Sequence, residues 1–334
     1  MRKRYVIFLL IFVVVGFIGV NIFFQDDDLN GDQVNDESNG MNNGILPSRE
    51  SKIPVNKTKM NPEIDNNPPK SYSDEYLDPI PVTGQVNTAG GEDSAFIMPD
   101  GDTLYFFFTP DVDQPVEIQV QDQVTGIYVS KNQGGIWEAP TRVLLQDHGK
   151  LALDGCAFIH GDIMYFCSAR EGYSGLHWFK AELINGTWCN WYNADYELKT
   201  GEYSTGELHI SSNGNELYFH SDRPGGKGLL DIWVSVKADD EWGEPVNIAI
   251  VNSEGNEGWP CISEDASELW FSKDYGVWRS KRVNGEWGEP EKMFWPLAGE
   301  PSIDRRGNMY FTHHFFQNDV MVEADIYVAY KKTS

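Results

Sequence analysis

Carboxylate side chains that could do chemistry recur just before several short apolar segments of the chain. They are Glu92, Asp93, Asp154, Glu207, Glu257 and Glu300. Two carboxyl groups at a fixed separation can hydrolyse a glycosidic bond, because one donates a proton while the other acts as base or nucleophile. The candidate catalytic residues of such a glycoside hydrolase are Asp93, Asp154, Glu207, Glu257 and Glu300.

The same acids have two simpler interpretations. They can be hydrated side chains at the polar mouth of a channel, or they can hold a cation. Their distances along the chain from the apolar segments differ, so they do not all point the same way. The polar-rim and cation interpretations therefore stay open beside the catalytic one.

The elements that must position these acids form an internal repeat. Each unit contains a polar or Gly-containing turn followed by an aromatic doublet: Leu104-Tyr105-Phe106, Met164-Tyr165-Phe166, Leu217-Tyr218-Phe219, Leu269-Trp270-Phe271 and Met309-Tyr310-Phe311. A second aromatic strand follows every doublet, as at Ile127–Val129 and Ile232–Val234. Units of about 40–60 residues with short strands are typical of the blades of a β-propeller. One such unit cannot bury its own faces, so it must recur until a ring closes.

The two ends of the repeat predict how the ring closes. Four units carry a Trp in an outer strand, whereas the last unit stops before one. Asp78–Val82 near the start resembles Gly243–Asn247 in the third unit. We therefore predict an all-β fold, a five-bladed β-propeller over residues 77–334. An N-terminal strand closes it, with residues 78–86 beside 322–331, which removes an open sheet edge.

Three stretches of the third unit resemble the TolB-type WD-like β-propeller repeat family. They are Ser221–Gly226, Asp231–Ser235 and Trp242–Pro245. The resemblance extends over about residues 78–331. It implies an extracytoplasmic propeller with a binding role, and it implies no particular catalytic residue.

The N-terminus predicts attachment to a membrane. Basic residues at positions 2–4 precede an apolar run from Tyr5 to Phe24, and about twenty helical residues span a bilayer. We predict that residues 1–24 are an uncleaved signal-anchor, a single transmembrane helix, with a cleaved signal peptide as the alternative. The positive-inside rule then places the C-terminal domain outside the cytoplasm, at the cell membrane.

Residues 25–76 are rich in Asn, Asp, Pro and Ser, and their apolar residues are isolated. Such a composition predicts a disordered acidic linker, because too little apolar surface is available to offset the entropy of ordering. Within it, a calcium-loop pattern is formed by Asp26, Asp28, Asn30 and Glu37. No amphipathic helix follows this pattern, so the solvated linker is preferred to a calcium site.

The net charge excludes one class of partner, and the cysteines raise the question of a disulfide. The net charge of −25 argues against nucleic acid as a partner, since phosphate would be repelled. Cys156 and Cys167 flank one turn, and outside the cytoplasm a disulfide between them stays open. The sequence predicts no cofactor or metal other than the calcium alternative.

The predicted function is recognition of a protein, peptide or glycan ligand by a membrane-anchored propeller. Exposed aromatic residues on connecting loops are favoured in interfaces, which singles out Tyr173 and Tyr203 as binding residues. Arg223 lies in a Gly-rich turn and is the third candidate binding residue. A glycoside hydrolase that uses the acids above is the alternative.

Overall fold

The computed structural model describes residues 46–201 and 203–333. Strands dominate this part of the chain, and its helices are the short segments η1 (Arg49–Lys52), α1 (Val116–Gln119) and α2 (Asp195–Leu198). None of the helices in the described ranges has the length and hydropathy needed to cross a membrane. The predicted signal-anchor of residues 1–24 and the calcium pattern from Asp26 to Glu37 lie outside the described residues.

The strands pair antiparallel in five consecutive units. The first unit contains β3 (Gly91–Ile97), β4 (Thr103–Thr109), β5 (Gly126–Gln133), β6 (Ile136–Trp137) and β7 (Thr141–Arg142). The second contains β8 (Ala152–His160), β9 (Ile163–Arg170), β10 (His177–Ile184) and β11 (Thr187–Asn193). The third contains β12 (Thr205–Ile210), β13 (Glu216–Ser221), β14 (Asp231–Ala238), β15 (Glu241–Trp242) and β16 (Val246–Asn247).

The last two units receive additional strands from the N-terminal part of the chain. The fourth contains β17 (Glu257–Ile262), β18 (Glu268–Lys273), β19 (Gly276–Val283), β20 (Glu286–Trp287), β21 (Glu291–Trp295) and, from the N-terminal side, β1 (Lys70–Ser71). The fifth contains β22 (Ala298–Ile303), β23 (Met309–Gln317), β24 (Val320–Ala329) and, likewise, β2 (Ile80–Pro81).

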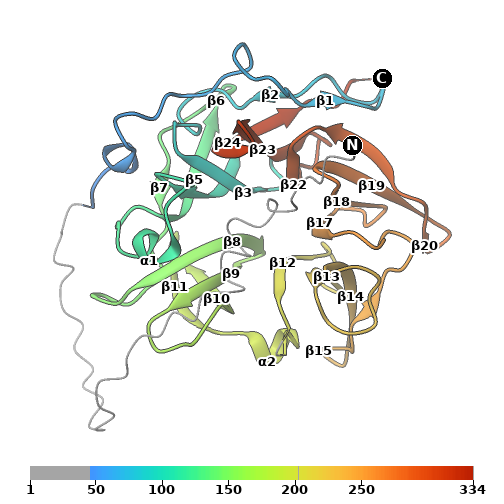
Figure 1. Ribbon diagram of the computed structural model, residues 1–334. Coiled ribbons are helices and arrows are strands. Elements are labelled where there is room, and N and C mark those ends of the chain that lie inside the picture. Colours follow the sequence, from blue (N-terminus) through green and yellow to red (C-terminus); the bar gives the residue numbers. More distant parts are fainter. Residues whose placement is uncertain (1–45, 202, 334) are drawn as a thin grey trace, which may run out of the picture.

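The innermost strand of each unit contacts the innermost strands of the units on either side. β3 contacts β8, β8 contacts β12, β12 contacts β17, β17 contacts β22, and β22 contacts β3. Figure 1 shows these strands in the middle of the molecule with the other strands outside them. A single parallel pair, Gly91 with Ala324, also joins the first and fifth units. The arrangement is of the β-propeller type.

The predicted aromatic doublets lie in the second strand of each unit and form the core. Phe106, Phe166, Phe219, Trp270 and Phe311 are at most 2% exposed. Alternate residues of a strand point to opposite faces, so a doublet supplies one ring to each face of its sheet. Full burial of one such side chain stabilises the fold by about 1.5–3 kcal/mol. The units are therefore held together by the packing that the repeat predicted.

The predicted pairing of the N-terminal strand with the end of the chain is present. Ile80 pairs with Val328 and Pro81 with Tyr327. The side-chain amide of Asn87 also bonds both the backbone N–H and the C=O of Ile326. The outer edge of the fifth unit is therefore covered by residues that precede the first unit.

Residues 46–76, which we call the strap, differ from the predicted disordered linker. They have defined positions against the propeller, and Met60 and Tyr76 are buried in its core; the strap is the blue segment leading to β1 in Figure 1. Asp65 Oδ2 lies 2.8 Å from His313 Nε2, a contact in which both side chains are almost fully buried. Composition predicts that such a segment cannot fold alone. The strap is instead ordered by partners that the propeller supplies.

Candidate functional site

The innermost strands share a local irregularity that composition did not predict. Each has an isoleucine as its last residue, or as its last but one in β8, and the pairing register shifts just before that isoleucine. The residue three positions before that isoleucine has a positive φ in every unit: Ser94 (49°), Cys156 (53°), Glu207 (20°), Trp259 (52°) and Glu300 (56°). A bulge of this kind re-aims a side chain. Left-handed backbone at non-glycine residues is strained and concentrates at functional sites.

Two of these positive-φ residues, Glu207 and Glu300, accept hydrogen bonds from a third one, Ser94. The backbone N–H of Ser94 donates to Glu300 Oε2 at 2.6 Å, and its Oγ donates to Glu207 Oε1 at 2.8 Å. Thr312 Oγ1 also donates to Glu300 Oε2, at 2.7 Å. The bulges on β3, β12 and β22 thus gather two carboxyl groups around one serine. We call Asp93, Ser94, Glu207 and Glu300 the axial cluster.

Burial dominates the electrostatics of the axial cluster. Burial raises the pKa of Glu207 to about 8, and the negative charge of Glu300 adds to it. The pKa of Glu300 is raised by burial, against hydrogen bonds from Ser94 and Thr312. For Asp93, burial and then the charges of Glu300 and Glu207 raise the pKa well above its ordinary value. A pKa of about 8 favours the protonated form of Glu207 at neutral pH, and the pKa values of Asp93 and Glu300 are shifted in the same direction.

Polar atoms of the axial region are left without partners. Among the described residues, Asp93 Oδ1 is buried and has no hydrogen-bond partner. The indole of Trp259 lies near enough to Glu207 to lower the pKa of that glutamate. The indole N–H of Trp259 nevertheless has no acceptor with hydrogen-bond geometry. Such atoms are unusual in a folded protein and mark functional positions or places for small polar molecules.

The other predicted acids have structural partners instead. Asp154 accepts hydrogen bonds from Ser168 Oγ at 2.6 Å and from Arg170 Nη2 at 2.7 Å. Glu257 accepts from the backbone N–H of Ser253 at 2.9 Å and forms an ion pair of 2.9 Å with Lys273. Asp154 and Glu257 are therefore paired with basic residues of their own units.

Glu92 and Glu257 occupy the same kind of loop. Thr88 donates its N–H and its hydroxyl to Glu92, as Ser253 does to Glu257. Both glutamates stand five residues before the terminal isoleucine, as Asp154 does, whereas Glu207 and Glu300 stand three before it. Counting back from the isoleucine would have separated the structural acids from the axial ones.

The predicted binding residues lie on neighbouring units. Tyr203 is 45% exposed, and the Arg223 guanidinium lies 5.4 Å from its ring centre. Arg223 also lies over Phe219 at 4.8 Å and over Trp233 at 5.6 Å, and it is partly buried. Tyr173 is partly buried, and its ring centre lies 5.1 Å from that of Phe179. Of the three, Tyr203 presents a sizeable exposed surface.

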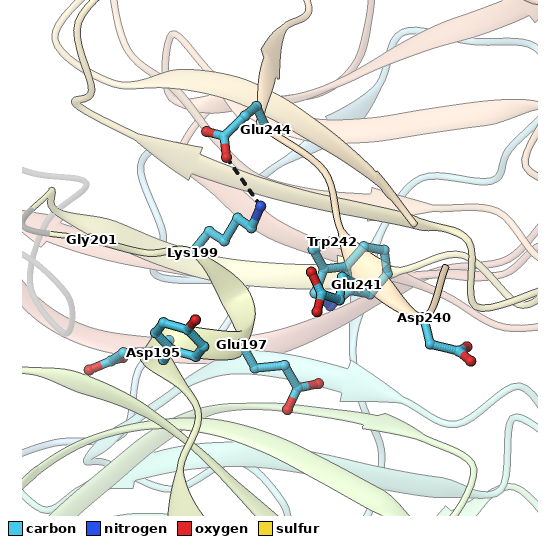
Figure 2. Close-up of a pocket in the computed structure, with 9 residues that line it drawn as sticks. Asp195, Glu197, Lys199, Gly201, Asp240, Glu241, Trp242 and Glu244 are labelled. Atoms are coloured by element: carbon cyan, nitrogen blue, oxygen red, sulfur yellow. Dashed lines mark hydrogen bonds and ion pairs between the residues drawn. The ribbon is translucent and has the colours of Figure 1, made fainter. Parts of the chain in front are cut away.

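A surface pocket lies where the second and third units meet, beside these residues. It has a volume of about 690 Å³ and is lined by Asp195, Tyr196, Glu197, Lys199, Gly201, Asp240, Glu241, Trp242 and Glu244. Figure 2 shows the labelled residues coming from α2 and the segment after it on one side, and from the β14–β15 turn, β15 and the residues after β15 on the other. We call this the acidic pocket, because five carboxylates face one lysine.

Some carboxylates of the acidic pocket are held in ion pairs with lysines, whereas others are not. Lys199 Nζ lies 3.1 Å from Glu244 Oε1, as drawn in Figure 2, and Lys180 Nζ lies 2.7 Å from Glu197 Oε1. Within the described residues, Asp240 and Glu241 form no ion pair. Tyr196 is 97% exposed. Sequence reasoning missed this pocket, because its acids are scattered over two turns and Tyr196 belongs to no repeated position.

Asp195 forms one wall of the acidic pocket and is bonded to His177. Asp195 Oδ2 lies 2.5 Å from His177 Nδ1, and this contact raises the pKa of His177. Burial acts to raise the pKa of Asp195, but the hydrogen bonds from His177 and the N–H of Trp178 outweigh it and lower that pKa. His177 Nε2 lies 3.0 Å from the backbone oxygen of Ser174. Both ring nitrogens are thus engaged, which makes this pair a structural support.

Within the described residues, no group of three or more His, Cys, Asp or Glu side chains has the geometry to hold a metal ion. All four cysteines are free, and Cys156 and Cys167 are both buried. The disulfide left open by the sequence is therefore not formed in this structure.

Comparisons with known proteins give structural likeness only. No protein-family model matches the sequence, and no curated protein matches it. TolB from Acinetobacter baumannii is 13% identical with a TM-score of 0.42, and the match covers 74% of this chain and 56% of that TolB. An endo-arabinase from Bacteroides thetaiotaomicron is 14% identical with a TM-score of 0.45, over 76% of this chain and 98% of the enzyme. An α-L-arabinofuranosidase from Podospora anserina is 12% identical with a TM-score of 0.39, over 75% of this chain and 95% of the enzyme. At these values the likeness carries no argument about activity.

Proposed function

We propose that the domain is a five-bladed β-propeller that acts as a binding module, and that its acidic pocket binds a basic segment of a polypeptide. The closed circle of contacts among β3, β8, β12, β17 and β22 supports the blade count. The lining of the acidic pocket carries the binding proposal: Asp240 and Glu241 have no ion-pair partner among the described residues, and Tyr196 beside them is exposed.

The chemistry of the acidic pocket favours lysine and arginine side chains over other ligands. Carboxylates attract cations through charge, and the face of an exposed tyrosine binds an ammonium or guanidinium group by about 0.5–1 kcal/mol. The chain as a whole carries a net charge of −25, which speeds the approach of a cationic partner at low salt. A neutral glycan would gain only the tyrosine contact and hydrogen bonds.

Binding of an octalysine peptide, followed by fluorescence anisotropy, tests this proposal. Tyr196→Ala and Asp240→Asn should each weaken binding, and together by about tenfold or more, equivalent to about 1.4 kcal/mol. Asp319→Asn is a matched control, because Asp240 and Asp319 are both exposed turn residues with φ of 65° and 64°. If octalysine does not bind, or binds the pocket variants as tightly as the native chain, the proposal fails. Binding of neutral oligosaccharides with the same dependence on Tyr196 would replace it with a glycan-binding function.

A glycoside hydrolase is the second candidate, supported by one observation. Glu207 and Glu300 both bond Ser94, and Glu207 has a pKa of about 8, as a general acid requires. A panel of chromogenic glycosides tests this function. Activity that is lost in Glu207→Gln and Glu300→Gln but kept in Asp319→Asn would establish it.

We also propose that residues 1–24 anchor the propeller in the cell membrane with its domain outside the cytoplasm. The apolar run after the basic residues 2–4 supports this. Protease added to intact cells should then digest the domain. Protection of the domain until the cells are lysed would contradict the proposed topology.

A further inference from the structure

The strap places one ammonium group against two buried carboxylates of the fifth unit. Lys59 Nζ donates to Glu323 Oε1 at 2.5 Å and also to Asp325 Oδ2. Both carboxylates come from β24, and each side chain is 1% exposed. Two buried carboxylates without a cation would be costly. This part of β24 therefore needs a positive charge from elsewhere in the chain.

The contacts around Lys59 are those of a binding site for an ammonium group. Its Nζ lies 5.8 Å from the ring centre of Phe315, and that ring is fully buried. A cation over an aromatic ring gains about 0.5–2 kcal/mol, depending on desolvation. Carboxylates and an aromatic ring together favour a charged ammonium over a neutral group of the same shape.

Contacts other than those of Lys59 also hold this site. The backbone N–H of Met60 donates to Glu323 Oε2 at 2.9 Å and so fixes that carboxylate. Among the described residues, Asp325 Oδ1 is buried and lacks a hydrogen-bond partner. An ammonium group has three N–H donors, so the site has an acceptor to spare. The Lys59 side chain is 39% exposed while its partners are not, which means that the site opens to solvent along the lysine stem.

The surrounding charges agree with this interpretation. Burial raises the pKa of Asp325, and the charge of Lys59 acts in the opposite direction. Glu92 lies close enough to add to the rise, and Arg49 of the strap forms an ion pair with Glu92 at 3.2 Å. Arg49 and Lys59 of the strap thus form ion pairs with three carboxylates where β3 and β24 lie side by side: those of Glu92, Glu323 and Asp325.

We propose that Glu323, Asp325 and Phe315 form a binding site for a primary ammonium group, and that the chain's own Lys59 occupies it. The ligand class is an alkylammonium, such as a lysine side chain. This contact holds the strap against β24 of the fifth unit, and loss of the lysine leaves a site open to an amine from solution. The site is separate from the acidic pocket and rests on different contacts.

Chemical rescue of Lys59→Ala tests the proposal. This substitution removes three methylene groups and the ammonium, which together correspond to n-propylammonium. We expect the full chain with Lys59→Ala to melt several degrees lower than the native chain. Propylammonium chloride at up to about 50 mM should restore at least half of that loss, because a ligand that binds only the folded state stabilises it. 1-Propanol, and sodium chloride at the same ionic strength, should not.

Lys57→Ala is the matched control for the rescue. Lys57 lies two residues away in the strap and pairs with Asp111 and Asp113 instead. Its variant should show no response to propylammonium beyond that to sodium chloride. Equal responses of the Lys59 and Lys57 variants would overturn the proposal. If Lys59→Ala does not fold, refolding with propylammonium but not with 1-propanol supports the site, and failure in both overturns it.

Cleavage by a lysine-specific protease gives a second measurement that needs no added ligand. Removing both acids in Glu323→Gln/Asp325→Asn should release Lys59, so that cleavage after Lys59 accelerates at least tenfold. The double variant combined with Lys59→Ala should also lose the response to propylammonium. Unchanged protection of Lys59 in the double variant would show that the carboxylates do not hold it.

Discussion

At the scale of single residues, buried charged side chains are the positions at which a substitution should lower the stability of this protein. Arg279 is fully buried, and its guanidinium bonds Glu75 at 2.5 Å, Glu268 at 3.0 Å and Glu291 at 2.6 Å. It also lies 5.1 Å from the ring centre of Trp270. Arg279 joins β19 to the segment that precedes β2. One cation therefore links the fourth unit to the N-terminal part of the chain.

Arg279→Met should destabilise the protein by about 1.5–3 kcal/mol, because the charged hydrogen bonds of the buried guanidinium are lost and Glu268 loses its cation, whereas the partly exposed Glu75 and Glu291 keep Lys281 nearby. The hydrogen bonds of Arg279 lower the pKa of Glu75 to about 2, so that pKa should rise in the variant. Urea unfolding at pH 7 measures the effect. Arg305→Met is the control, since Arg305 is 65% exposed and pairs with Glu264 at the surface. Its cost should stay below about 1 kcal/mol, and equal costs for the two variants would contradict this assignment.

The axial cluster predicts a dependence of stability on pH. Glu207 has a folded pKa of about 8, above its ordinary value of 4.5. Between these values the folded state keeps a proton that the unfolded state releases, so stability falls as pH rises. The contribution is complete below about pH 4.5 and is lost as pH rises through about 8. Burial raises the pKa of Glu92 to about 7 as well, so Glu92 also makes the folded state less stable as pH rises.

Glu207→Gln should therefore flatten the pH dependence of the melting temperature. The stability of the variant relative to the native chain should increase by on the order of 4 kcal/mol between pH 5 and pH 8.5. Thermal unfolding across this range checks it, with the exposed Glu286→Gln as control. A native chain whose melting temperature rises over the same range would contradict the buried, protonated state of the cluster.

At the scale of elements, strand β2 and the residues after it complete the fifth unit. The N–H of Val82 donates to the backbone oxygen of Ile326 at 3.0 Å. Its side chain is 6% exposed and packs in the cluster that contains Ile326 and Val328. Without this segment, the outer edge of β24 would be open to pairing with another chain.

Val82→Asp should destabilise the protein by at least about 3 kcal/mol, because it places a charge in an apolar cluster. It should also promote association through the exposed edge of β24. Ile80→Asp is the control, since Ile80 lies two residues earlier, in β2, but is 46% exposed. Urea unfolding and size-exclusion chromatography measure the two effects. Similar behaviour of both variants would mean that the closure does not contribute to stability.

At the scale of the whole molecule, the net charge of −25 is the dominant property. Like charges spread over a compact domain repel one another and favour expansion. Added salt screens them, since the Debye length falls from about 30 Å at 0.01 M to about 3 Å at 1 M. The buried pairs of Lys59 and Arg279 are screened much less than surface charges.

The melting temperature should therefore rise when sodium chloride increases from about 10 mM to 500 mM. Differential scanning calorimetry at pH 7 measures the change. Potassium chloride at the same ionic strength should have the same effect, because the mechanism is screening and not binding of a specific ion. A fall in melting temperature would show that surface ion pairs outweigh the repulsion.

The local repeat of the sequence determined the class of fold and the way in which the chain ends meet. The aromatic doublets recur because each sheet needs a ring on both faces, and Pro79–Val82 shows by its own pattern that it is an outer strand. These features depend on neighbours in the chain, so they can be predicted without coordinates. The same reasoning included Glu207 and Glu300 among its candidate acids, and both bond Ser94 in the structure.

Only the tertiary structure decided which side chains meet. Glu207 and Glu300 belong to different units, and they share Ser94 because a bulge turns each inner strand at the same place on a closed circle. The strap was expected to be disordered, because its composition cannot bury a core; it is ordered by Glu323, Asp325 and His313, which lie more than two hundred residues further along the chain. The physical reason is that local patterns fix the strands, whereas long-range packing fixes which charges are buried together.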